Sequence, residues 1–226
     1  MPYLLYGDVQ LEQEDVDLLT PPLWLNDSLI EFYYEYLERE TYPPSTGIAF
    51  LRPALVQLIA HQQDPSSLKS ALPPNLSVQR AIFCPMTDVT SNTVGGSHWN
   101  LLVFYRDTNT FYYYDSSGGY NLGSAQEKIR NLYVALSDEN ANVEPKFAQV
   151  ATPSQINGYD CGCYVLAITD LLARRLSARS ASNILATKLP EKPGDVSQWS
   201  LSEVLAPDKV HGQRHRLREL IERLRK

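Results

Sequence analysis

The segment from residue 98 to residue 115 constrains the fold of this chain more than any other. Its letters, HWNLLVFYRDTNTFYYYD, hold two apolar runs, 99–105 and 111–114, on either side of a polar turn at 107–109. Runs rich in aromatic and branched side chains are typical of β-strands, and a short polar turn between two of them predicts a hairpin. Because the first run is apolar at nearly every position, we expect it in the middle of a sheet.

Helices are predicted on either side of this hairpin. Asn26 and Asp27 are N-cap candidates for a helix that runs to about residue 40, before Pro43 and Pro44. The remaining patterns predict helices at 53–62, 66–71, 124–137, 161–176 and 199–226, and strands at 81–84, closed by Pro85, and at 146–150. Strands and helices do not alternate regularly, so we expect an α+β fold with a mixed central sheet flanked by helices. A chain of 226 residues fits one domain, with a core at about 4–175 and a helical extension at about 199–226.

The charge of the chain is unevenly distributed. Its formal net charge is −6, which argues against general nucleic-acid binding because phosphate neutralisation needs a basic surface. Residues 1–40 carry ten acidic side chains and one basic one, whereas residues 211–226 carry six basic and two acidic ones. Leu217, Leu220 and Leu224 recur at helical spacing in the basic tail, which favours a helix with a solvated charged face. The acidic front could be solvated in the same way, or it could attract a basic partner.

The cysteines and the hydropathy pattern indicate an intracellular protein. No apolar run reaches the roughly 18 residues of a membrane span, and the first ten residues lack the pattern of a secretion signal. Cys84, Cys161 and Cys163 are too few, and odd in number, for a disulfide framework. We therefore expect free thiols in the cytoplasm or the nucleus. Only one C-x-C pair is present and the four histidines are scattered, so no metal or other cofactor is expected.

Cys161 stands where a polar, glycine-containing loop runs into the apolar helix predicted at 161–176. Unpaired N–H groups and the helix dipole favour an anion at a helix N-terminus, so this position suits a thiolate nucleophile. A small buried residue is the alternative interpretation of Cys161 taken alone. A thiol nucleophile needs an imidazole base, and the base needs an orienting group.

His98 and Asp115 are the candidates for base and orienting group. His98 opens a strand after the polar loop at 87–97, and Asp115 closes the next strand, so a hairpin brings them to the same end of the sheet. Asp115 taken alone could equally form the turn that follows it. Gln155, a loop amide six residues before Cys161, could donate a hydrogen bond to a developing oxyanion. The four residues together supply the chemistry of a cysteine hydrolase.

Four short motifs carry a resemblance to a known family. They are His98-Trp99, Asp115-Ser116, Gln155 with Asp160-Cys161-Gly162, and, near the front, Trp24-Leu25-Asn26-Asp27. In these motifs and in the order His, Asp, Cys the chain resembles the ubiquitin-like protease family, the Ulp and sentrin-specific proteases. The resemblance covers about residues 4–175, and the loops before His98 and Cys161 are most similar to those of deneddylating members.

The resemblance implies a cysteine protease that cleaves after the C-terminal di-glycine of a ubiquitin-like modifier. The modifier implied is the neddylation modifier, with precursor processing and cleavage of isopeptide bonds to lysine. Trp24 and Trp99, with Gly95 and Gly96, would flank a narrow tunnel for the tail, and Asp27 would pair with an arginine of the tail or cap its helix. No cofactor is implied, and the enzyme is expected to act as a monomer. The alternatives are a desumoylating protease, an acyltransferase with the same His-Asp-Cys set, and an inactive modifier-binding module.

Overall fold

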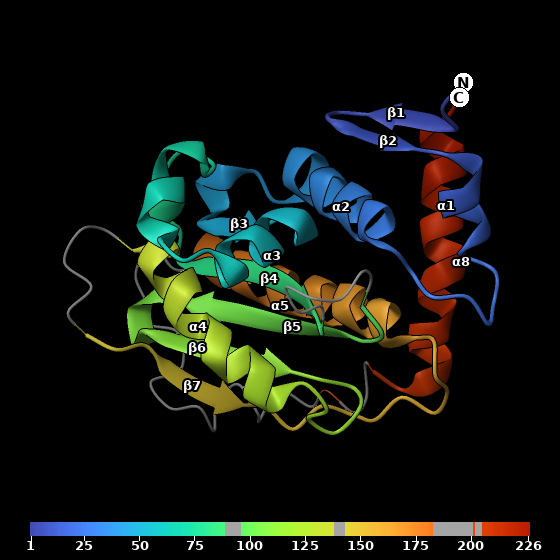
Figure 1. Cartoon of the computed structure of the whole chain (residues 1–226). Coiled ribbons are helices and arrows are strands. Elements are labelled where there is room, and N and C mark those ends of the chain that lie inside the picture. The colour runs from blue at the N-terminus through green and yellow to red at the C-terminus, as the bar shows by residue number, and fades with distance from the viewer. Residues whose placement is uncertain (89–95, 138–142, 183–200, 202–204) are drawn as a thin grey trace.

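The computed structural model describes the chain except for residues 89–95, 138–142, 183–200 and 202–204. The described part holds a two-stranded hairpin, a five-stranded sheet and helices on both sides of that sheet (Figure 1). The strands are β1 (Leu4–Tyr6), β2 (Val9–Leu11), β3 (Ile48–Phe50), β4 (Ala81–Thr87), β5 (Trp99–Tyr105), β6 (Thr110–Tyr114) and β7 (Lys146–Gln149). The helices are α1 (Gln13–Asp17), α2 (Asp27–Tyr36), α3 (Pro53–His61), α4 (Leu122–Leu136), α5 (Cys161–Ser182) and α8 (Pro207–Leu224). Gly95, and most of residues 199–204 of the predicted C-terminal helix, lie outside the described residues.

The central sheet has the strand order β3-β4-β5-β6-β7. Strands β4, β5 and β6 pair antiparallel, whereas the edge strands β3 and β7 run parallel to their neighbours. The predicted hairpin is present, with Tyr105 opposite Thr110 and Leu101 opposite Tyr114. The mixed sheet with its flanking helices confirms the predicted α+β class.

The two faces of the sheet carry separate hydrophobic cores. Every residue of β5 and β6 is buried, although successive side chains point to opposite faces. Phe104 and Phe111 pack with α3 and α4 on one face, and Val103 and Tyr112 pack with α2 and α5 on the other. Figure 1 accordingly shows α4 in front of the sheet and α5 behind it. Coverage on both faces explains why these strands are apolar without alternation.

Strand β4 is longer than the sequence predicts, because it continues through Pro85 to Thr87. The carbonyl of Phe83 accepts from the N–H of Leu51, so Phe83 presents its backbone polar groups towards β3. Pro85, two residues on, faces the same side, but β3 has already ended at Phe50. The missing N–H of proline therefore removes no hydrogen bond from the sheet.

Several short elements near the N-terminus were not predicted. Strands β1, β2 and β3 have three residues each and α1 has five, which is too short for a periodic pattern. The helix predicted to end near residue 40 is α-helical only to Tyr36 and then continues as a π-helical stretch, Leu37–Thr41. The length of this predicted helix was therefore right, and its last turn is wider than an α-helical turn.

The C-terminal helix α8 runs along one side of the molecule and packs against α5 and β1 (Figure 1). Its apolar stripe is buried at Leu217, Leu220 and Ile221. The hydroxyl of Tyr3 donates to the Glu222 carboxylate, and the Arg225 guanidinium lies 4.0 Å from the centre of the Tyr3 ring. The first and last segments of the chain therefore lie side by side.

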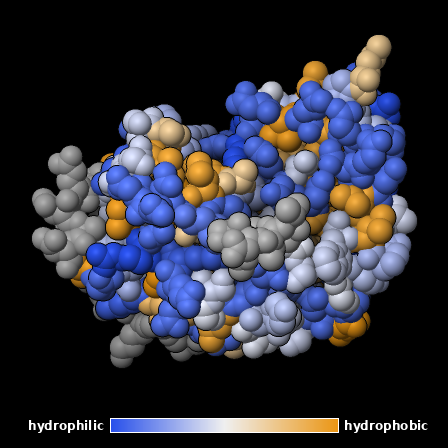
Figure 2. Space-filling view, in the orientation of Figure 1, coloured by the Kyte–Doolittle hydropathy of each residue, from blue (hydrophilic) through white to orange (hydrophobic). Residues whose placement is uncertain are grey.

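The face of the molecule seen in Figure 2 is mainly hydrophilic, and its apolar side chains form small, separate groups. This distribution follows from the two cores, which take up most of the large apolar side chains. Among the described residues, no helix combines the length and hydropathy that crossing a bilayer requires.

Candidate active site

Cys161 is the first residue of α5, and it borders a cavity of about 220 Å³. The cavity lies where the start of α2, the start of β5 and the start of α5 meet, and it is lined by Trp24, Leu25, Asn26, Asp27, Thr87, Gly96, Ser97, His98, Trp99 and Cys161. Six of the nine residues selected from the sequence therefore surround one space. The predicted placement of Cys161 at a helix N-terminus is confirmed.

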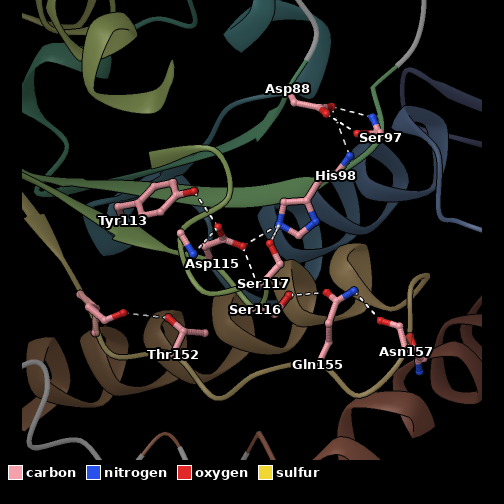
Figure 3. Close-up of polar contacts among 12 residues, drawn as sticks. Asp88, Ser97, His98, Tyr113, Asp115, Ser116, Ser117, Thr152, Gln155 and Asn157 are labelled. Atoms are coloured by element: carbon pink, nitrogen blue, oxygen red, sulfur yellow. Dashed lines mark hydrogen bonds and ion pairs between the residues drawn. The ribbon is translucent and has the colours of Figure 1, made fainter. Parts of the chain in front are cut away.

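The β5–β6 hairpin brings His98 and Asp115 together, as predicted. The Nε2 atom of His98 is 2.6 Å from Oδ1 of Asp115 and 3.2 Å from the hydroxyl oxygen of Ser117 (Figure 3). Cys161 lines the same cavity as this imidazole and contributes to its electrostatic surroundings. Because Nε2 faces Asp115, the other ring nitrogen, Nδ1, is left for the thiol.

The Asp115 carboxylate is kept ionised by its donors. Its Oδ1 accepts from the N–H of Ser117 at 2.9 Å, and its Oδ2 accepts from the hydroxyl of Tyr113 at 2.9 Å and the N–H of Gly119 at 3.0 Å (Figure 3). Burial raises the pKa of this carboxyl, but the bonds from His98, Ser117 and Tyr113 outweigh it and bring the pKa to about 2. Asp115 is therefore negative at every physiological pH.

His98 is positively charged at neutral pH. Burial lowers the pKa of the imidazole, but the hydrogen bonds to Asp115 and Cys161, and the negative charges of both partners, raise it to about 9. The site therefore places a charged imidazole and Cys161 at the wall of the same cavity.

Gln155 is not among the residues that line the cavity, but it is fixed beside the end of β6. Its Oε1 accepts from the hydroxyl of Ser116 at 2.7 Å, and its Nε2 donates to the carbonyl of Asn157 at 2.6 Å. Its backbone N–H donates to the carbonyl of Ser116 at 2.8 Å, so the loop before α5 is held against the residue that follows Asp115 (Figure 3). A side-chain amide has two N–H donors, and these contacts use one.

Trp24 and Trp99 are oriented by their indole N–H groups. Trp24 donates to the carbonyl of Gly158 at 2.7 Å while 45% of the residue stays exposed. Trp99 donates to the carbonyl of Leu25 at 2.8 Å and is buried. Trp99 therefore belongs to the core and also lines the cavity.

Asp27 does not cap α2, because Asn26 does so. The Asn26 side chain accepts from the N–H of Leu29 at 3.1 Å. The Asp27 side chain is left at the cavity wall, where burial raises its pKa. Within the described part of the chain, no cation forms an ion pair with it.

Asp88, which the sequence analysis did not select, holds the backbone at His98. Its Oδ1 accepts from the N–H of Ser97 at 2.6 Å and from the N–H of His98 at 3.2 Å (Figure 3). At Gly96 an added Cβ would lie 2.7 Å from the Cβ of Thr87, so only glycine fits at this position. An aspartate that follows a strand is common in turns, so the sequence alone does not indicate that Asp88 binds the backbone at Ser97 and His98.

The other two thiols are not part of the cavity. Cys84 and Cys163 are fully buried, and burial raises the pKa of both thiols, so they remain protonated. Over the residues that the structure describes, no cluster of three or more His, Cys, Asp or Glu side chains is placed to hold a metal ion.

Gly162 is required by packing. A Cβ built on this residue would lie 3.0 Å from the Cβ of Leu25 and 3.3 Å from its Cγ. We expect Gly162→Ala to lower the free energy of unfolding by about 1–3 kcal/mol, because an added methyl group overpacks a buried contact. Chemical denaturation measures this. The control is Gly123→Ala in α4, where nothing lies within 4 Å and alanine should leave stability unchanged or higher. Equal stability of the two variants would contradict the packing argument.

Sequence comparison relates the chain to known proteins. Residues 23–192 match the Ulp1 protease family, C-terminal catalytic domain. Sentrin-specific protease 8 of Mus musculus is 32% identical over 225 residues, which cover 99% of this chain and 93% of that protein. NEDD8-specific protease 1 of Arabidopsis thaliana is 36% identical over 184 residues, which cover 80% of this chain and 79% of that protein.

Structural comparison gives the same fold. The C-terminal Ulp1 protease domain in complex with Smt3, the yeast ortholog of SUMO, superposes with a TM-score of 0.59 at 20% identity and covers 100% of this chain and 89% of that chain. A de-sumoylating protease superposes with a TM-score of 0.62 at 14% identity, covering 96% and 87%. With the family match over most of its length and the His98–Asp115 pair beside Cys161, this chain belongs to the Ulp1 family of cysteine proteases.

Proposed function

We propose that this protease cleaves the bond after the C-terminal di-glycine of the neddylation modifier, both in its precursor and in isopeptide conjugates with lysine. The observation that carries the proposal is the cavity in which Cys161 and His98 meet two tryptophans. Bulky indole rings at the wall of a small cavity favour a tail of glycine residues over one with side chains. Relatives whose names include NEDD8-specific protease support this choice of modifier.

The proposed nucleophile is the thiolate of Cys161. The thiolate attacks the carbonyl carbon of the terminal glycine, and the bond from that carbon to the lysine nitrogen breaks. The leaving amine takes a proton from Nδ1 of His98, and a thioester to Cys161 remains. A water molecule, whose proton passes to His98, then attacks the thioester and releases the modifier with a free carboxylate. Asp115 keeps the imidazole in place through both steps and stabilises it whenever it carries the proton.

The proposed oxyanion donors are the second N–H of the Gln155 amide and backbone N–H groups at the start of α5. Gln155 is held by Ser116 and Asn157, so its amide would not need to reorganise during the reaction. Donors fixed before the reaction stabilise the developing charge most effectively. The unpaired N–H groups at the first turn of α5 act in the same direction.

Asp27 is the proposed contact for a basic residue in the tail of the modifier. Its carboxylate lies at the cavity wall and its pKa is raised by burial, so a cation from the substrate would replace the lost solvation. The proposed chemistry uses His98, Asp115 and Cys161 of a single chain and needs no residue from a second copy, so we expect the enzyme to act as a monomer. A reducing compartment, the cytoplasm or the nucleus, suits the free thiols.

The modifier is tested with three fluorogenic substrates that carry the neddylation modifier, the sumoylation modifier or ubiquitin in front of the same leaving group. We expect kcat/KM for the neddylation modifier to exceed the other two values by about 100-fold or more, because differential binding of a whole modifier involves several contacts. Initial rates at substrate concentrations below KM give the ratio directly.

A preference for the sumoylation modifier would replace this proposal with a desumoylating protease of the same family. A Cys161→Ala preparation, purified in parallel, is the control for contaminating proteases. Acetyl transfer from acetyl-coenzyme A without hydrolysis of any of the three substrates would instead indicate an acyltransferase.

A further inference from the structure

Helix α8 reaches the residue that precedes Cys161. The guanidinium Nε of Arg214 donates to Oδ1 of Asp160 at 2.8 Å, and Nδ1 of His211 lies 3.0 Å from Oδ2. Asn157 donates to Oδ2 as well, at 2.8 Å. Asp160 and Arg214 are only 2% and 3% exposed, so this is a buried ion pair, whereas the other arginines of α8 are at least partly exposed.

The same arginine also binds the backbone of two segments that are far apart in the sequence. Its two terminal nitrogens donate to the carbonyl of Tyr159 at 2.7 Å and to the carbonyl of Leu18 at 2.9 Å. The guanidinium carbon lies 5.4 Å from the centre of the Tyr159 ring. A planar guanidinium makes several bonds in fixed directions, so Arg214 sets the position of the loop that ends at Asp160.

Asp160 links Arg214 to the nucleophile, because it precedes Cys161 and is bonded to the first turn of α5. Its carbonyl accepts from the N–H of Tyr164 at 3.0 Å, which is the first backbone bond of α5, and Cys161 is the next residue. The buried thiol of Cys163 also faces the carboxylate of Asp160. A displacement of Asp160 would therefore displace the first turn of α5 and change the separation of Cys161 from His98.

We propose that Arg214 and His211 of α8 are positioning residues for the nucleophile, and that they act by holding the Asp160 carboxylate. This rests on the proposed role of Cys161. An unheld carboxylate next to Cys161 would also repel the thiolate, and the cationic side chain of Arg214 neutralises that charge. Residues 207–224 lie beyond the 23–192 that match the family, so this support comes from outside the matched catalytic segment.

The test is the rate at which iodoacetamide alkylates Cys161 in the full chain, measured from pH 5 to pH 9 by mass spectrometry of the peptide. The variants are His211→Ala, Arg214→Lys and His211→Asn. In the first two we expect the midpoint of the rate–pH curve to rise by about one unit and kcat for the modifier substrate to fall about 5- to 20-fold with KM unchanged. Asparagine places an uncharged donor where Nδ1 stood, so His211→Asn should remain within about twofold of the parent.

The control is His215→Ala, on the same helix, because the side chain of His215 is 75% exposed and, among the described residues, its ion pair is with Glu219. Midpoints that stay at the parent value in His211→Ala and Arg214→Lys would overturn the proposal, as would no rescue by His211→Asn or an equal shift in His215→Ala. If Arg214→Lys does not fold, the two His211 variants test the proposal without it, because His211 is half-exposed and its replacement should not prevent folding. Alkylation needs no modifier. If the parent protein does not cleave the modifier, the proposed function is wrong, but the alkylation rates still test the positioning role of Arg214 and His211.

Discussion

Replacing Cys161 by alanine is expected to reduce hydrolysis of the modifier substrate by at least about 10⁴-fold while leaving modifier binding intact. The alanine removes the only sulfur that lines the cavity among the described residues, and its smaller side chain disturbs none of the contacts that hold His98, Trp24 or Trp99. Turnover of a fluorogenic modifier conjugate measures the first effect. Titration calorimetry of the processed modifier with the variant measures the second.

Cys84→Ala is the matched control for this substitution. Cys84 is fully buried in β4, on the face of the sheet that packs with α3 and α4, and it does not line the cavity. Its loss should change stability slightly and leave turnover per folded molecule unchanged. If turnover persisted in Cys161→Ala and disappeared in Cys84→Ala, Cys161 would not be the nucleophile.

The sequence predicted the sheet centre and the His98–Asp115 pair for one physical reason. A hairpin of two largely apolar strands has a register that its turn fixes, and that register determines which residues meet at its open end. Cys161 was predicted from an equally local signal, the change from a glycine-containing loop to an apolar helix. Local patterns therefore sufficed for the three residues on which the proposed chemistry depends.

The residues that hold Cys161 in position could not be predicted in the same way. Asp160 and Arg214 are 54 residues apart, and no local pattern links them. The basic tail suggested a solvated face, and most of its cations fit that interpretation, but Arg214 is buried and is a correction to it. A weak signal was present, because His211, Arg214 and Arg218 follow each other at spacings of three and four and so share one face of a helix.

The roles of Asp27 and Gln155 show where residue type alone is ambiguous. Asn26 and Asp27 are equally good helix caps, and only the structure shows that Asn26 binds the N–H of Leu29. Gln155 was expected near the nucleophile, and it is held by Ser116 and Asn157 without lining the cavity. Side-chain direction, rather than residue type, decides both cases.

Asp115→Asn is expected to change the charge of His98 as well as its position. The hydrogen bond and the charge of Asp115 are main causes of the raised pKa of His98, about 9 against an ordinary 6.5. The protonated imidazole therefore stabilises the fold fully below pH 6.5, and this contribution is lost as the pH rises through about 9. Without the carboxylate, the imidazolium loses its proton at a lower pH, and the thiolate loses its counter-ion at neutral pH.

In Asp115→Asn we expect kcat/KM at pH 7.5 to fall about 10³- to 10⁴-fold, because an amide cannot accept from His98 and from the N–H groups of Ser117 and Gly119 as a carboxylate does. The alkaline limb of the pH profile, near pH 9 in the parent, should move to lower pH. Single-turnover rates from pH 5.5 to pH 10 measure both effects. Asp107→Asn, in the turn at the other end of the hairpin and paired with Arg80, is the matched control and should retain the parental profile. An alkaline limb that stays near pH 9 in Asp115→Asn would show that Asp115 does not set the charge of His98.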